Sequence, residues 1–143
     1  MIYAGIGSRE IPYEQCARIT QIAKDLDARG YLLRSGGAKG ADTAFAAGST
    51  KKEILRPEHA TEAAIKLAST LHPAWGACSD YAKKLHGRNM MIVLGKTLDS
   101  PVDFVICWTM DENNGGTSMG LRLARKYSIK VTNLKRQEFV LPV

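Results

Sequence analysis

RSGGAKGADTAFAAG (residues 34–48) is the stretch of the sequence that decides the fold. It overlaps the apolar run YLLRS (31–35), which predicts a strand, and it leads into a helix expected from about Ala41. Three glycines fall within positions 36–40 between the two elements. Glycine lets the backbone approach a ligand closely, and the N-terminus of a helix favours negative charge. The stretch therefore predicts an α/β fold that binds an anion at this turn.

The same alternation of strand and helix runs through the whole chain. Helices are expected at 12–28, from about Ala41, and at 59–70, 79–94 and 117–127, and strands at 2–6, 31–35, 53–55, 103–108 and 130–134. Because such strands pair in parallel through right-handed crossovers, we expect a doubly wound, mostly parallel, Rossmann-like sheet of about five strands, with helices on both faces. The 143 residues, 45% of them hydrophobic, fit a single domain spanning residues 1–143.

Composition narrows the classes of function. The net charge of +6 is carried by scattered basic residues and mildly favours an anionic partner. The three cysteines, at positions 16, 78 and 107, form no C-x-x-C pair, so neither a disulfide framework nor a zinc site is expected. No cofactor and no metal are predicted. The sequence has no membrane-length apolar run and no signal-peptide pattern, which together indicate a cytoplasmic protein.

Three glycine-bearing turns follow predicted strands and are expected at one edge of the sheet. In a doubly wound sheet, ligands bind beyond the carboxyl ends of the strands, so the three turns together predict a site for a phosphate or a nucleotide. The fingerprints for ordinary dinucleotide binding and for P-loop hydrolysis are both absent from the sequence. The residues of the three turns are Gly7, Ser8 and Arg9; Ser35, Gly36 and Gly37; and Gly115, Gly116 and Thr117.

Two further residues have a functional and a structural interpretation. Arg88 lies on an otherwise apolar helical stripe, so its guanidinium needs either an internal carboxylate or a bound anion as partner. Trp108 ends the fourth predicted strand, where its ring could stack on a base or pack in the core. The sequence alone leaves both alternatives open for each residue.

Five motifs in this order resemble the SLOG superfamily, which includes the Lonely Guy (LOG) phosphoribohydrolases and the DNA-processing protein DprA. The motifs are YAGIGSRE (3–10), LLRSGGAKGADTAF (32–45), LHGRN (85–89), DFVICWTMD (103–111) and GGTSMGLRLA (115–124). The chain is similar in particular to small stand-alone members found in phages and bacteria. The resemblance spans nearly the whole chain and implies a Rossmann-like fold with a nucleotide ligand. For a phage-encoded member, the expected location is the host cytoplasm.

The resemblance also implies roles for individual residues. Arg88 and Asn89 match a helix motif of the LOG enzymes in which the arginine contacts the ligand. Gly120 stands where those enzymes carry their catalytic glutamate, and Ala46 stands where the small relatives usually carry a glutamate. The alanine is either natural or a deliberate replacement that keeps a ligand intact. Asp42 lies one helical turn before position 46, so a carboxylate at 46 would share its face.

The leading hypothesis is a nucleotide N-glycosidase that splits a nucleoside monophosphate, or a related nucleotide, into base and sugar phosphate. A carboxylate suits this reaction because it stabilises or captures an oxocarbenium-like transition state. The catalytic candidates are position 46, Asp42, Arg88 and Asp111. The three glycine turns and Asn89 would bind the substrate, and Trp108 or Met119 would flank the base.

Two other functions stay open. One is a non-catalytic nucleotide sensor or sponge, which the loss of both expected glutamates favours. The other is single-stranded DNA binding like that of DprA, which the basic charge permits. The sequence lacks a clustered basic stripe with interleaved aromatic residues, so a nucleic-acid partner is not expected. A homodimer is expected from the resemblance, with Met90, Met91 and Ile92 either at the contact or in the core.

Overall fold

The computed structural model describes residues 1–142 and contains one five-stranded, all-parallel sheet with the strand order β3-β2-β1-β4-β5. The strands are β1 (Ile2–Gly7), β2 (Leu32–Ser35), β3 (Lys52–Ile54), β4 (Phe104–Trp108) and β5 (Lys130–Asn133). The helices are α1 (Tyr13–Ala28), α2 (Ala41–Ala47), α3 (Glu62–Leu71), α4 (Asp80–Leu94) and α5 (Gly116–Lys126), with 3₁₀ turns at Pro57–His59 and Trp75–Ala77. The predicted doubly wound α/β fold is confirmed.

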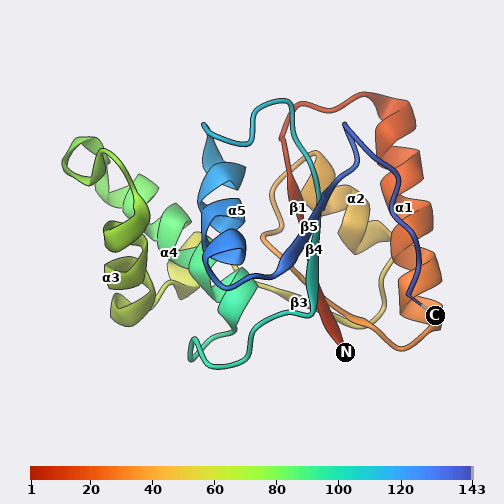
Figure 1. The fold of residues 1–143 in the computed structure, drawn as a ribbon, viewed down its shortest axis with the longest axis horizontal. Coiled ribbons are helices and arrows are strands. Elements are labelled where there is room, and N and C mark those ends of the chain that lie inside the picture. Colours follow the sequence, from red (N-terminus) through yellow and green to blue (C-terminus); the bar gives the residue numbers. More distant parts are fainter. Residues whose placement is uncertain (143) are drawn as a thin grey trace.

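Helices cover both faces of the sheet, as Figure 1 shows: α1 and α2 lie on one face, and α3, α4 and α5 lie on the other. Side chains of β4 alternate between the two resulting cores, because successive residues of a strand point to opposite faces. Val105 and Cys107 pack with the α4 side, whereas Ile106 and Trp108 pack with the α1 side. The central strands therefore read as continuous apolar runs, which is typical of a sheet buried on both faces.

The second half of α4 belongs to the core. Met90, Met91 and Ile92 are each at most 2% exposed, and α4 packs against both α3 and α5. The interpretation of these three residues as a dimer contact is therefore wrong, because α3 and α5 already cover their apolar side chains. No helix within residues 1–142 is both long and apolar enough to cross a membrane.

Caps account for small differences from the predicted helix boundaries. The helix expected at 59–70 begins at Glu62, because the Thr61 side chain accepts a hydrogen bond from the amide of Ala64 (3.1 Å) and so caps the helix. The residues before it form the 3₁₀ turn Pro57–His59 instead. Ser79 caps α4 in the same way, by accepting from the amide of Ala82 (3.1 Å).

The strand order places the site. The chain builds β1, β2 and β3 in one direction along the sheet and β4 and β5 in the other, so the order reverses between β1 and β4. The loops after β1 and β4 leave this point toward opposite faces of the sheet, which opens a crevice at its carboxyl edge. In Figure 1 this edge lies at the top, since β1 begins at the bottom beside the N-terminus.

Candidate functional site

Ser8 joins the loops that follow β1, β2 and β4 at the carboxyl edge. Its amide donates to the carbonyl oxygen of Trp108 (2.9 Å), and its own carbonyl accepts from the amide of Ala41 (3.0 Å), the first residue of α2. Its hydroxyl lies 3.5 Å from that of Thr109. The structure therefore brings the turn after β1 against both the end of β4 and the start of α2.

Two consecutive residues of α4 hold the other two glycine turns. One guanidinium nitrogen of Arg88, Nη1, donates to the carbonyl oxygens of Gly36 (2.8 Å) and Leu55 (3.1 Å). Its Nε donates to Oδ1 of Asn89 (3.0 Å), and Nδ2 of Asn89 donates to the carbonyl oxygen of Gly116 (2.7 Å). Arg88 is only 7% exposed. This pair positions the turn after β2 relative to the start of α5, so the three predicted turns form one edge.

Asp42 places a carboxylate in the first turn of α2. Its side chain is buried, and Oδ2 accepts from the amide of Ala38 (3.3 Å). Burial raises the pKa of Asp42 to about 6, although the charge of Arg88 and the nearby amides of Ala38, Gly36 and Gly7 act to lower it. Its Oδ1 has no hydrogen-bond partner among residues 1–142. Asp42 thus takes the position near the glycine turn and helix N-terminus that a bound phosphate would take.

The turn after β2 is closed by packing. A Cβ atom on Gly36 would lie 2.6 Å from Nη1 of Arg88 and 2.8 Å from Oδ2 of Asp42. A Cβ atom on Gly37 would lie 2.8 Å from the side chain of Ile54. Glycine is therefore required here by the protein's own side chains, whether or not a ligand binds.

The turn before α5 is open. A Cβ atom on Gly115 or on Gly116 would meet nothing within 4 Å, and both residues are exposed. The first amides of a helix have no carbonyl partner within it, and they carry the positive end of its dipole. The amides of Gly116 and Thr117 begin α5, a helix of 11 residues. This end of α5 can therefore accept an anion from solvent.

Other predicted site residues lie inside the protein or bond to their own loop. The Ser35 hydroxyl donates to the carbonyl oxygen of Gly5 (2.6 Å). Trp108 is 4% exposed and packs in the core on the α1 side, and Met119 is 1% exposed in the opposite core. Asp111 is exposed and accepts from Nδ2 of Asn114 (3.0 Å), and hydrogen bonds from its own loop lower its pKa.

The two positions that the resemblance assigns to a catalytic glutamate differ in their surroundings. Ala46 is half-buried on α2, and its carbonyl accepts from Nζ of Lys52 (3.0 Å). Gly120 is buried, and a Cβ atom there would lie 3.2 Å from the side chain of Ile6. A glutamate at 120 would therefore enter the packing between α5 and the sheet, whereas position 46 is partly exposed to solvent.

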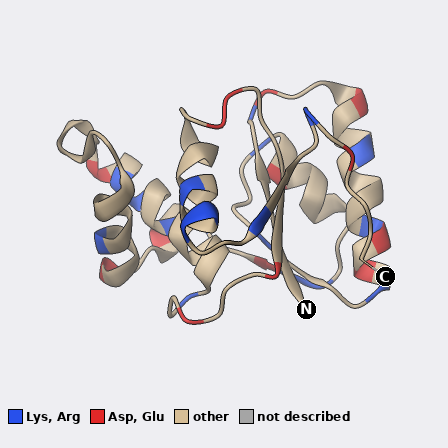
Figure 2. Cartoon of the chain, in the orientation of Figure 1, with Lys and Arg blue, Asp and Glu red and all other residues tan. Residues whose placement is uncertain are grey.

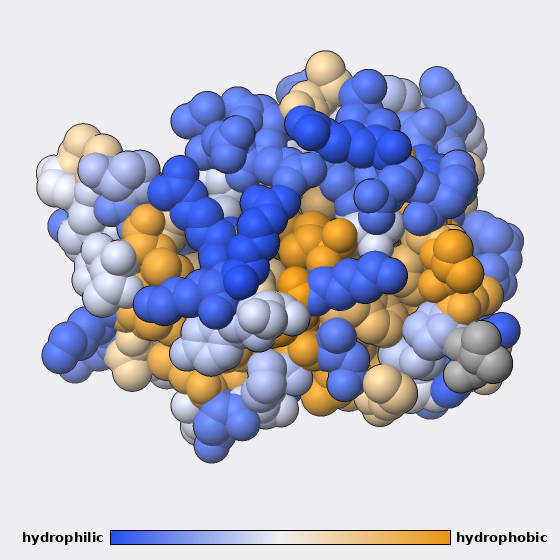
Figure 3. All heavy atoms as spheres, viewed as in Figure 1, coloured by the Kyte–Doolittle hydropathy of each residue, from blue (hydrophilic) through white to orange (hydrophobic). Residues whose placement is uncertain are grey.

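Exposed basic residues follow three strands at this edge. Arg9, Lys39 and Arg56 come after β1, β2 and β3, and none of them has a salt-bridge partner among the described residues. Figure 2 shows both basic and acidic segments in the loops at this end of the sheet, and Figure 3 shows hydrophilic side chains gathered over the same loops. Lys39 and Arg56 were not among the predicted site residues, although Lys39 lies within the glycine turn itself.

Tyr13 is a second surface feature that sequence reasoning missed. It begins α1 directly after the loop that carries Arg9, and 85% of it is exposed. Tyr13, Lys24 and Lys39 help to line a groove of about 550 Å³ between α1 and α2. An exposed aromatic ring beside lysines is the combination that stacks bases and attracts phosphates.

The acidic loop before α5 is neutralised by its neighbours. Glu112 accepts hydrogen bonds from Arg125 and from Nδ2 of Asn133 (2.9 Å), and Nε of Arg136 lies 3.6 Å from its carboxylate. The hydrogen bond from Asn133 is the main cause that lowers the pKa of Glu112. The carboxylate is therefore charged but paired, and it adds little repulsion toward an anion at the start of α5.

Comparison with known proteins gives one informative match. No protein-family model and no curated protein matches the sequence. The structure of DNA processing protein A from Helicobacter pylori, described for its single-stranded DNA binding mode, is similar to 92% of this chain, with a TM-score of 0.64 and 20% sequence identity. The chain spans 63% of the length of that protein. The likeness establishes that this chain shares the Rossmann-like fold of that protein.

The same match corrects one expectation. Single-stranded DNA binding was one alternative from the sequence, but a nucleic-acid partner was not expected, because the sequence lacks a clustered basic stripe. That expectation is overturned, because a protein with this fold binds single-stranded DNA. Basic residues that are scattered along the sequence reach one edge of the sheet when each follows a different parallel strand, as Arg9, Lys39 and Arg56 do.

Proposed function

We propose that this chain binds single-stranded DNA, with the sugar–phosphate backbone crossing the carboxyl edge of the sheet. The observation that carries the proposal is the open N-terminus of α5, where a Cβ atom on Gly115 or Gly116 would meet nothing within 4 Å. A phosphate placed there would receive backbone hydrogen bonds and the favourable helix dipole. The turn after β2 offers no comparable place, because Asp42 and Arg88 occupy it.

The positions of the basic residues and the exposure of Tyr13 favour a ligand with several phosphates over a ligand with one. Arg9, Lys39 and Arg56 lie in the loops of three adjacent strands, so their charges are spread along the edge. Tyr13 offers an exposed ring on which a base could stack. The fold that this chain shares with DNA processing protein A adds support, since that protein binds single-stranded DNA.

The salt dependence of binding tests the proposal. Each phosphate neutralised on a single strand contributes about −0.7 to the slope of log K against log salt, so about three contacts predict a slope of about −2. Fluorescence anisotropy with a labelled oligonucleotide measures this slope. Lys39→Ala should weaken binding and flatten the slope, whereas Lys130→Ala, at the amino end of β5, should change neither. Equal effects of the two variants, or absence of binding, would contradict the proposal.

A nucleotide N-glycosidase is the second candidate, favoured by the pKa of about 6 at Asp42. A carboxyl group that titrates close to neutral pH is suited to general acid catalysis. Release of free base from ribo- and deoxyribonucleotides, followed by liquid chromatography, tests the reaction in this chain and in the Asp42→Asn and Ala46→Glu variants. Release that Asp42→Asn abolishes would assign the acid to Asp42.

The Ala46→Glu variant separates the remaining outcomes. Release from that variant alone would place the catalytic acid of this fold at position 46, so that the chain with Ala46 binds its nucleotide without cleaving it. If none of the three proteins releases free base, the N-glycosidase proposal is wrong. Competition of mononucleotides with the labelled oligonucleotide would then distinguish a nucleotide sensor from a DNA-binding protein.

A further inference from the structure

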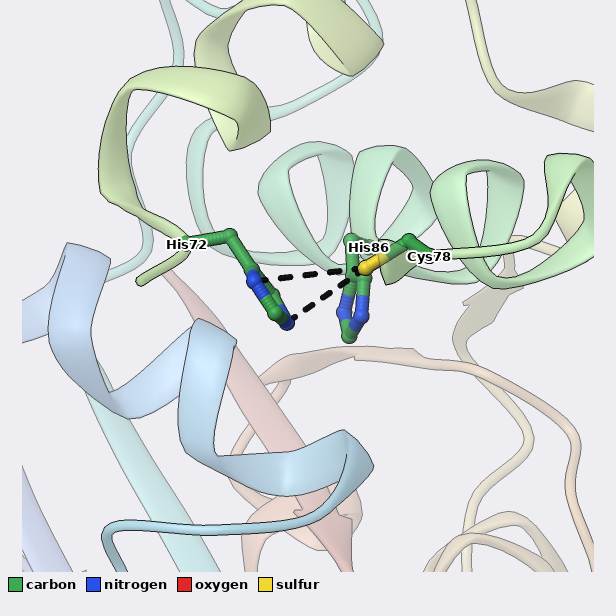
Figure 4. A group of neighbouring side chains, drawn as sticks. All are labelled: His72, Cys78 and His86. Carbon is green, nitrogen blue, oxygen red and sulfur yellow. Dashed lines mark hydrogen bonds between the residues drawn. The ribbon is translucent and has the colours of Figure 1, made fainter. Parts of the chain in front are cut away.

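Three side chains that can bind a metal meet beside α4. His72 follows the last residue of α3, Cys78 lies just before α4, and His86 lies within α4. Figure 4 shows the two imidazole rings and the thiol side by side. One ligand atom from each residue lies within 4.8 Å of the other two. Sγ of Cys78 lies 3.6 Å from Nε2 of His72 and 3.9 Å from its Nδ1.

We propose that His72, Cys78 and His86 bind a zinc ion, with water as the fourth ligand. Around a tetrahedral zinc ion, with Zn–S of about 2.3 Å and Zn–N of about 2.0 Å, sulfur and nitrogen ligands lie about 3.5 Å apart. The separation of 3.6 Å between Cys78 and His72 already matches this value. Two imidazoles and one thiolate also form a donor set that suits zinc and does not suit magnesium or calcium.

His86 supplies an independent observation. Its Nδ1 is buried and has no hydrogen-bond partner among residues 1–142. A buried ring nitrogen without a partner costs free energy, because folding removes the water that would otherwise bond to it. Its ring centroid lies 4.8 Å from that of His72, and one of its ring nitrogens lies within 4.8 Å of a ligand atom of His72 and of Cys78. A metal ion between these atoms would supply the missing partner for the ring.

Two adjustments accompany binding. The Cys78 thiol releases its proton to solvent and coordinates as the thiolate. Nδ1 of His72 accepts from the amide of Ala74 (2.9 Å), so the proton of the neutral ring lies on Nε2. Coordination through Nε2 moves this proton to Nδ1 and gives up the bond to Ala74. The cost is one exposed hydrogen bond, of about 1 kcal/mol, which is small beside the free energy of zinc coordination.

Such an ion would link the segment between α3 and α4 to α4. The ligands come from both ends of the segment 72–78 and from the second turn of α4. Trp75 in the middle of this segment already packs near both rings, with centroids 6.1 Å from His72 and 6.2 Å from His86. Arg88 follows His86 by two positions and holds the turn after β2, so zinc would also steady the helix that positions the proposed DNA-binding edge.

Cobalt substitution tests the site directly. The full chain without an affinity tag is stripped of metal and titrated with Co²⁺, then with Zn²⁺. We expect one equivalent to bind, with a thiolate-to-cobalt charge-transfer band in the near ultraviolet, tetrahedral d–d bands in the visible region, and loss of both on addition of zinc. The Cys78→Ser variant should lose the charge-transfer band, whereas Cys16→Ser, at another half-buried cysteine, should keep it. Absence of the band from the unmodified chain, or its persistence in Cys78→Ser, would overturn the site.

Thiol protection gives a second measurement that needs no variant. In the unmodified chain, Zn²⁺ should slow alkylation of Cys78 by at least about tenfold, while Cys16 reacts at the same rate with and without the ion. Peptide mass spectrometry reads both cysteines in one sample. An unchanged rate at Cys78 in the presence of Zn²⁺ would overturn the proposal, even if Cys78→Ser fails to fold.

Discussion

The turn after β2 and the turn before α5 share their sequence pattern and differ in what they do. Both place glycines between a strand and a helix at the same edge of the sheet. At Gly36 a side chain is excluded because Arg88 and Asp42 occupy the space, whereas at Gly116 nothing lies within reach of a Cβ atom. A glycine turn is therefore evidence of a close approach, and the approaching group can be the protein's own carboxylate. Only the turn before α5 is left for an outside anion.

Gly36→Ala should have the largest effect on stability. The new methyl group would meet Nη1 of Arg88 at 2.6 Å, and that nitrogen is fixed by bonds to two carbonyl oxygens. Overpacking of this kind costs about 3 kcal/mol, and displacement of a buried charged pair adds to it. Urea unfolding followed by circular dichroism measures the loss. Gly116→Ala is the matched control and should stay within about 0.5 kcal/mol of the unmodified chain. Equal losses in the two variants would remove the contrast between the turns.

Gly115→Ala should have the next largest effect, for a different reason. Gly115 has φ of +89° and ψ of −180°, a backbone conformation that only glycine adopts without strain. Alanine there should cost about 1 to 2 kcal/mol in unfolding free energy, although space for its side chain is free. The same unfolding experiment tests it. A loss as small as that of Gly116→Ala would mean that the exposed loop relaxes into another conformation.

The fold was predictable from the sequence because its signals are local. Apolar runs predicted every strand and helical spacing predicted every helix, and most of the predicted boundaries lie within two residues of those observed. The sequence could not predict that the turn after β2 is filled by the protein's own side chains, because this depends on Arg88, more than 50 positions away in sequence. The sequence left the partner of Arg88 open between an internal carboxylate and a bound anion, and the structure places Asp42 beside it.

The group of His72, Cys78 and His86 was missed for the same reason. Its spacing, H-x₅-C-x₇-H, matches no local zinc pattern, and it comes together only because the segment 72–79 folds back onto α4. The apolar end of α4 shows the converse limit. A helix that is apolar on several sides has the same sequence pattern at a subunit interface as in a core. Only the packing of α3 and α5 around α4 shows that these residues belong to the core.

The pH dependence of stability should reveal the carboxylate in the closed turn. Burial raises the pKa of Asp42 from 3.8 to about 6, so the folded chain binds this proton more tightly than the unfolded chain does. Stability from this group therefore rises as the pH falls, by about 1 kcal/mol between about pH 7.5 and about pH 5. Asn at position 42 cannot titrate. As the pH falls through this range, the unfolding free energy of the unmodified chain should therefore rise by this amount relative to that of Asp42→Asn. A difference that stays constant with pH would mean that the carboxylate is not buried.

The last prediction makes the open turn resemble the closed one. Gly116→Asp places a carboxylate in the first turn of α5, as Asp42 does in α2. The helix dipole favours this charge, so the unfolding free energy should rise slightly, by about 0.5 kcal/mol. Binding of a single-stranded oligonucleotide should weaken roughly fivefold, because two like charges about 4 Å apart in water repel by about 1 kcal/mol.

Gly116→Asn is the control for this substitution, since it has the same shape without the charge. It should bind the oligonucleotide almost as the unmodified chain does. Stability and binding therefore move in opposite directions in Gly116→Asp, a result that general damage to the fold cannot produce. If Gly116→Asp and Gly116→Asn bind equally well, no phosphate lies at the start of α5. The anion would then have to be held by Arg9, Lys39 and Arg56 alone, in the loops that follow β1, β2 and β3.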